Sequence, residues 1–142
     1  MEKGTFQKIE KSKDRMYGPW KLLLCGYSAD EQQLFLSFLE KIGLGDLPVV
    51  FVCDDQKNIS LKQVLNEPHG SGLGKDSNLQ RAGILSGFTQ EDVHLLLSEY
   101  RKAGFPKQLW ATVTPISIRW EMGFLLVELV KEAKAMGRKR TR

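Results

Sequence analysis

Residues 20–28 read WKLLLCGYS, and residues 81–89 read RAGILSGFT. In each stretch a short apolar run ends in glycine, which predicts a strand that is buried on both faces. The hydroxyl residue that follows, Ser28 or Thr89, can cap a helix, with Glu31 or Asp92 at the third helical position. The two stretches therefore predict the same strand-to-helix junction twice.

The junctions belong to a longer correspondence, in which the chain aligns with itself at a shift of 61 residues without a gap. The identical pairs are Leu24/Leu85, Gly26/Gly87, Leu34/Leu95, Leu36/Leu97, Ser37/Ser98, Lys41/Lys102, Gly43/Gly104, Val52/Val113, Leu65/Leu126 and Glu67/Glu128. Periodicity predicts strands at 20–27, 47–53, 82–88 and 109–114, and helices at 29–42, 61–66, after Thr89 as far as Gly104, and at 120–136. Equal spacing across every element favours an internal duplication.

Alternating strands and helices predict an α/β fold. We expect two tandem βαβα pseudo-repeats that form one four-stranded sheet, parallel or mixed, with helices on both faces. The alternative is a ferredoxin-like α+β sheet with an extra C-terminal helix. The expected organisation is a disordered leader at 1–18, one domain at 19–136 and a basic tail at 137–142; within the domain, repeat one spans about 20–67, the linker 68–80 and repeat two about 81–136.

The composition excludes several classes of protein. The formal charge is +4, and much of the excess lies at the two ends of the chain, in Lys8, Lys11, Lys13 and Arg15 and in Arg138, Lys139, Arg140 and Arg142. Such tails are usually solvated, so nucleic-acid binding is a minor alternative. The sequence has neither a signal-peptide core nor an apolar run that could cross a bilayer, which predicts a cytoplasmic protein without membrane contact.

The predicted strands end in small thiol or hydroxyl residues: Cys25, Cys53, Ser86 and Thr114. In a parallel sheet all four would share the carboxyl edge, where open α/β sheets bind ligands. In a ferredoxin-like sheet they would separate to opposite edges. No histidine is placed to activate a thiol, so small residues packing at strand ends are the simpler reading. We predict no catalytic residue, no metal site and no cofactor.

The last predicted helix is apolar nearly all round, with Glu128 almost alone among apolar neighbours. Such a helix is either buried within the fold or presents a face to a partner. The candidate interface for a homo-oligomer is formed by Met122, Phe124, Val127 and Val130.

The second half also carries a family resemblance. It lies in Ala82-Gly-Ile-Leu-Ser-Gly-Phe88, in Arg101-Lys-Ala-Gly104, in Val113-Thr-Pro115, and in Trp120 with Leu125, Leu126 and Glu128. From about residue 81 to residue 134 the chain resembles the uncharacterised bacterial family called Domain of Unknown Function 3783. The resemblance implies a fold and a bacterial cytoplasmic setting, and it implies no reaction.

Together these observations favour a non-enzymatic binding or protein-interaction module with an unidentified protein partner. One alternative is a small-molecule-binding protein or thiol-dependent enzyme at the strand-end Cys, Ser and Thr residues. A second alternative is weak nucleic-acid binding through the basic termini.

Overall fold

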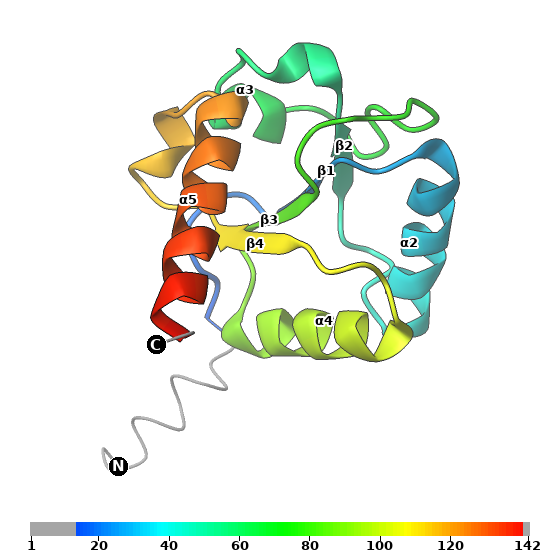
Figure 1. Ribbon diagram of the computed structural model, residues 1–142. Coiled ribbons are helices and arrows are strands. Elements are labelled where there is room, and N and C mark those ends of the chain that lie inside the picture. Colours follow the sequence, from blue (N-terminus) through cyan, green and yellow to red (C-terminus); the bar gives the residue numbers. More distant parts are fainter. Residues whose placement is uncertain (1–13, 141–142) are drawn as a thin grey trace.

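The computed structural model describes residues 14–140, with side chains as far as residue 137 (Figure 1). The elements follow the order β1 (Lys21–Cys25), α2 (Ala29–Lys41), β2 (Val49–Val52), α3 (Leu61–Leu65), β3 (Ala82–Ser86), α4 (Gln90–Ala103), β4 (Leu109–Thr112) and α5 (Met122–Arg140). We call residues 20–67 the first unit and residues 81–136 the second unit. The predicted helices and strands are all present, with boundaries that differ by a few residues.

The four strands form one mixed sheet in the order β2-β1-β3-β4. β1 pairs in parallel with β2, and β3 pairs in parallel with β4, whereas β1 and β3 are antiparallel. The predicted α/β fold is therefore confirmed, with a mixed sheet. The ferredoxin-like alternative is wrong, because each strand pairs in parallel with the next strand of its own unit.

The register of the sheet follows the 61-residue shift. Leu23 pairs with Val50 in the first unit, and Ile84 pairs with Ala111 in the second. At the antiparallel seam between the units, Leu23 lies opposite Ile84. Residues 61 positions apart thus occupy corresponding places on the two sides of the seam.

Helices cover both faces of the sheet (Figure 1). Alternation along the strands sends Leu22 and Leu24 to the face covered by α2 and α4, and Leu23 and Cys25 to the face covered by α3 and α5. On the first face a group of rings packs mainly edge to face or tilted, with Phe35 at its centre. The sheet is therefore the middle layer of three.

The helix starts use the predicted caps. The Ser28 hydroxyl accepts a hydrogen bond from the Glu31 amide, and the Glu31 side chain accepts one from the Ser28 amide. Thr89 accepts from the Asp92 amide in the same way. Gly104 ends α4 with φ of 81°, a left-handed conformation that glycine adopts without steric cost.

The described part of the expected leader and part of the linker are bonded to the domain, whereas residues 1–13 of the leader lie outside the described residues. The amide of Met16, in the expected leader, donates to the Phe88 carbonyl, and the Tyr17 carbonyl accepts from the Gly87 amide. The linker is also bonded to the sheet, since the Phe51 amide donates to the Ser71 carbonyl at 2.9 Å and the Gly70 amide donates to the Val49 carbonyl at 2.8 Å. Residues 69–72 therefore cover the outer edge of β2, and we call them the β2-edge loop.

Candidate functional site

The strand-end residues do not gather at one edge of the sheet. Cys25 pairs with Ala82 at one end of the β1–β3 seam, and Ser86 pairs with Lys21 at the other end. Because β1 and β3 are antiparallel, Cys25 and Cys53 lie at one edge while Ser86 and Thr114 lie at the opposite edge. The expectation of one four-residue edge required a parallel sheet, and the antiparallel seam divides the four residues into two pairs.

The two thiols are poorly suited to nucleophilic chemistry. Cys25 is fully buried, and burial raises the pKa of its thiol to about 12. The pKa of the Cys53 thiol is also raised, mainly by burial. Its Sγ lies 3.8 Å from the Phe51 carbonyl oxygen. Both thiols are therefore held in the protonated form, whereas the thiolate is the reactive form.

The two hydroxyls take different structural roles. The Thr114 Oγ1 accepts hydrogen bonds from the amides of Ile116 and Ser117, which forms a turn after β4. The Ser86 Oγ is buried and has no hydrogen-bond partner among the described residues. Beside the outer strand β2, His69 Nδ1 accepts from the Val49 amide at 3.0 Å, so this imidazole helps to bind the β2-edge loop. Within residues 14–137 no group of three His, Cys, Asp or Glu side chains could hold a metal ion.

A polar cluster that the sequence did not predict joins the two units. The guanidinium of Arg81 lies 3.9 Å above the centre of the Tyr27 ring and bonds to Glu31 at 3.0 Å. The Tyr27 hydroxyl donates to Gln108 Oε1 at 2.7 Å, and the Tyr100 hydroxyl is within 3.1 Å of the same oxygen. These side chains bond to one another at the boundary between the units, so the cluster acts as a structural tie, although the buried Gln108 Nε2 has no hydrogen-bond partner among the described residues. The only sequence signal was an arginine placed directly before a buried strand.

A groove runs beside β4, the edge strand that no other described strand covers on its outer side. Its main part is a cavity of about 530 Å³ whose lining comes from both faces of β4 and from the helix on each face. We call this groove, with the adjoining cavity of about 450 Å³ near the start of β4, the edge slot. Its main lining residues are Val93 and Leu97 of α4, Leu109, Trp110, Ala111 and Thr112 of β4, and Leu125, Glu128, Leu129 and Glu132 of α5.

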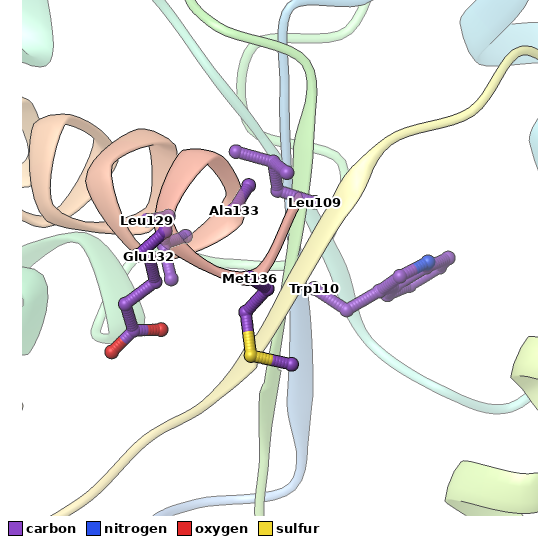
Figure 2. Close-up of a pocket in the computed structure, with 7 residues that line it drawn as sticks. Leu109, Trp110, Leu129, Glu132, Ala133 and Met136 are labelled. Atoms are coloured by element: carbon purple, nitrogen blue, oxygen red, sulfur yellow. The ribbon is translucent and has the colours of Figure 1, made fainter. Parts of the chain in front are cut away.

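Successive residues of β4 face opposite sides of the edge slot. Figure 2 shows Leu109 turned toward Ala133 of α5, with Trp110 pointing to the other side of the strand. The Trp110 ring packs at 5.1 Å against Tyr100 of α4. Among the described residues that line the slot there is no lysine or arginine, whereas Glu128 and Glu132 lie on its α5 side. The slot is thus apolar on the α4 side, and on the α5 side it combines apolar side chains with two carboxylates.

The candidate interface on α5 is only partly accessible. Met122 is fully buried in the core, so it cannot contact a partner. Phe124 and Val127 are 50% and 54% exposed, and Val130 lines a third cavity of about 460 Å³. The Trp120 ring packs edge to face on Phe124 at 4.9 Å. Of the four predicted interface residues, Phe124 and Val127 are therefore exposed, Val130 is partly exposed and Met122 is buried.

The fold and these surfaces define a small α/β module with an open mixed sheet, one covered outer edge and one uncovered outer edge. No helix in the described part of the chain is long and apolar enough to span a bilayer.

The second unit, which contains the edge slot, is also the part of the chain that matches a known family. Residues 81–136 match the family model described as Domain of unknown function (DUF3783), which confirms the predicted resemblance. This match spans less than half of the 142 residues. No curated protein and no solved structure matches the chain.

Proposed function

We propose that this chain is a non-enzymatic protein-interaction module that binds its partner at the edge slot of the second unit. The observation that carries the proposal is an uncovered strand edge that lies between apolar side chains of two helices. Isolated apolar surface residues are ordinary, but a continuous apolar groove beside a free strand edge is typical of a peptide-binding surface. The protonated state of both thiols supports a binding role over a thiol-dependent one.

The test is a selection of binders from a random-peptide library against the full chain. We expect enriched peptides that bind the unmodified protein and lose at least about tenfold in affinity for Trp110→Ala. Leu34→Ala is the matched control, because Leu34 is 62% exposed on α2, away from the slot. Circular dichroism would verify that both variants fold. Failure to enrich any peptide, or equal binding to both variants, would contradict the proposal.

A second candidate is homo-oligomerisation through the exposed face of α5. It is favoured by the half-exposed Phe124 and Val127 side chains, which lie one helical turn apart. Light scattering at about 10 μM should show a dimer that Phe124→Glu dissociates, since a carboxylate cannot be buried unpaired in an apolar interface. Leu34→Glu places the same charge on an exposed leucine of α2 and should leave the dimer intact. A monomeric unmodified protein would end this candidate.

Two alternative functions make different experimental predictions. A thiol-dependent enzyme or small-molecule site at Cys25, Cys53, Ser86 and Thr114 requires a reactive cysteine, so iodoacetamide should label Cys53 in the native protein. Nucleic-acid binding requires the basic termini, of which residues 1–13 and 141–142 lie outside the described residues, and it predicts an affinity for DNA that falls steeply with salt.

The internal correspondence and the free cysteines also bear on the origin and cellular location of the chain. We propose that the two units arose by duplication, and the equal strand registers at a 61-residue offset support this. A bacterial cytoplasmic setting is supported by the family resemblance and by two free cysteines, which a reducing compartment preserves. Cell fractionation would test the location.

A further inference from the structure

We infer that the edge slot binds an extended peptide segment of a partner protein, which adds to the sheet as a fifth strand and alternates apolar and basic side chains. This inference rests on the proposed interaction function and specifies the chemistry of its ligand. It follows from three observations: the way the first unit covers its own edge, the direction of the free backbone groups of β4, and the charges that line the slot.

The first unit provides an internal template for such a complex. In that unit the β2-edge loop bonds to the carbonyl of Val49 and to the amide of Phe51. The residues 61 positions further on are Trp110 and Thr112, which lie on the edge strand of the second unit. Beside them no described segment takes the place of the loop. The second unit therefore has the same strand edge without its cover.

The cause of this difference is the point at which each helix ends. After α3 the chain reaches Pro68, which disfavours continued helix, and Lys21 binds the carbonyls of Leu65 and Glu67. The residue equivalent to Pro68 is Leu129, a good helix former, and α5 continues through it to Arg140. The segment that could have returned to cover β4 is instead part of a helix.

The free backbone groups of β4 can be assigned from its pairing. The Leu109 and Val113 amides donate to the Arg81 and Leu85 carbonyls of the β3 side. Along a strand, alternate residues direct their backbone groups to opposite sides, so Trp110 and Thr112 direct theirs into the slot. Each presents one donor and one acceptor at the spacing that an added extended strand requires.

Each unit also has a glutamate at the corresponding position near its outer strand. In the first unit, Glu67 accepts a hydrogen bond from the Ser71 hydroxyl at 2.5 Å and so holds the β2-edge loop. Its equivalent is Glu128, which lines the edge slot together with Glu132. Glu128 contacts Lys131 at 3.3 Å on the exposed side of α5, and no basic side chain within residues 14–137 lines the slot. The carboxylates therefore favour a ligand that carries lysine or arginine on the α5 side.

The same charges argue against a second copy of this chain as the occupant. A symmetric dimer through β4 would bring two acidic slots together, and like charges at close range oppose association. A single extended segment avoids this repulsion. Its side chains alternate between the two faces, so one set meets Val93, Leu97 and Trp110 while the other meets the carboxylates.

The test measures binding of a fluorescein-labelled peptide, Gly-Val-Lys-Val-Lys-Val-Gly, to the full chain by fluorescence anisotropy. We expect Glu132→Lys to weaken binding at least about tenfold, because it reverses a charge in the slot. Glu40→Lys, an exposed glutamate on α2, is the matched charge control and should bind as the unmodified protein does. A peptide with the same residues in the order Gly-Lys-Lys-Val-Val-Val-Gly should bind at least about tenfold more weakly.

Two further measurements test strand addition itself. Thr112→Pro removes the amide that faces the slot and leaves the β3 ladder intact, so it should abolish binding, whereas Thr112→Ala should not. Two further peptides carry N-methyl groups on the backbone, one at its valines and the other at its lysines. One of these two peptides should fail to bind. This pair of peptides keeps the test decisive if Thr112→Pro does not fold.

The inference is overturned if the scrambled peptide binds equally well, if both N-methylated peptides still bind, or if Glu132→Lys has no effect. It is also overturned if light scattering shows a dimer that Thr112→Pro dissociates, since a second copy would then occupy the slot. If library peptides bind at the slot but alternating peptides do not, this inference fails and the proposed function stands. If no peptide binds at all, both fail.

Discussion

The two outer edges of the sheet are built from corresponding residues, but only one of them is covered. At β2, the backbone of Val49 and Phe51 is covered by the β2-edge loop, whereas at β4 the corresponding Trp110 and Thr112 face an open groove. An unpaired strand edge invites pairing with another chain, and natural proteins usually cover it. The two edges differ because α3 ends at Leu65, before Pro68, so that the chain can return along β2, whereas α5 continues to Arg140.

A substitution at Gly72 should disrupt the covered edge most strongly. Its φ is +81°, and a Cβ there would overlap the carbonyl oxygen of Phe51. We expect Gly72→Ala to lower the free energy of unfolding by more than about 3 kcal/mol, because it combines backbone strain with a clash. Gly74→Ala is the control: φ is +92° with no atom within 4 Å of the added Cβ, so the cost should be about 1 kcal/mol. If urea denaturation shows the same loss of unfolding free energy for both variants, the loop does not have the proposed covering role.

Hydrogen exchange can compare the two edges directly. The Phe51 amide donates to Ser71, whereas the Thr112 amide faces the slot. We expect the Phe51 amide to exchange at least about 100-fold more slowly than the Thr112 amide, as measured by NMR. Binding of the alternating peptide should slow exchange at Thr112 and leave Phe51 unchanged. Equal protection of the two amides in the free protein would show that the β4 edge is not open.

High pH should lower the stability of the protein through Cys25, at a position where the second unit has Ser86. An unfolded cysteine ionises near pH 9, whereas burial keeps Cys25 protonated up to its folded pKa of about 12. The unfolded state therefore binds fewer protons in this window, and stability is lost as the pH rises from 9 toward 12. Between about pH 8 and pH 10, we expect Cys25 to contribute a loss on the order of 1 kcal/mol.

The control for this measurement is Cys25→Ala, which should lose less stability over the same pH range by that amount. Burial also raises the pKa of Tyr27, and this group contributes to the alkaline loss in both proteins. Identical pH profiles for the two proteins would contradict the assignment to Cys25.

The smallest expected effect is at Ser86. Its buried hydroxyl has no hydrogen-bond partner among the described residues, so desolvation of this group is not compensated. We expect Ser86→Ala to raise the free energy of unfolding by up to about 1 kcal/mol. Ser28→Ala, which removes a helix cap, should lower it by about 1 kcal/mol in the same assay. A loss at Ser86 comparable with that at Ser28 would indicate a hydrogen bond at the Ser86 hydroxyl.

Much of the fold could be predicted from local chemistry. Ser28 and Thr89 cap helices as their spacing indicates, and the apolar runs before them form buried strands. The relative direction of the two units could not be predicted, because each βαβ unit satisfies its own pairing and the antiparallel seam depends on contacts across the chain. This seam is what divides the strand-end residues between two edges.

The candidate site was harder to predict for a related reason. Residues 69–72 have the polar, glycine-rich composition of a free linker, yet their backbone covers β2. Backbone hydrogen bonds to a strand edge leave little trace in side-chain composition. The sequence predicts the apolar character of α5 but not its orientation, because Met122 faces the core and the groove lies beside the adjoining edge strand, with Trp110.

The seam between β1 and β3 has a further consequence for assembly. Its like-for-like pairing of Leu23 with Ile84 is the geometry of an isologous dimer, here contained in one chain. Because the linker tethers the two halves, the effective concentration of one for the other is high and does not vary with dilution. The outer edge of β4 can therefore stay open to a transiently bound peptide, because the stability of the sheet does not depend on that peptide.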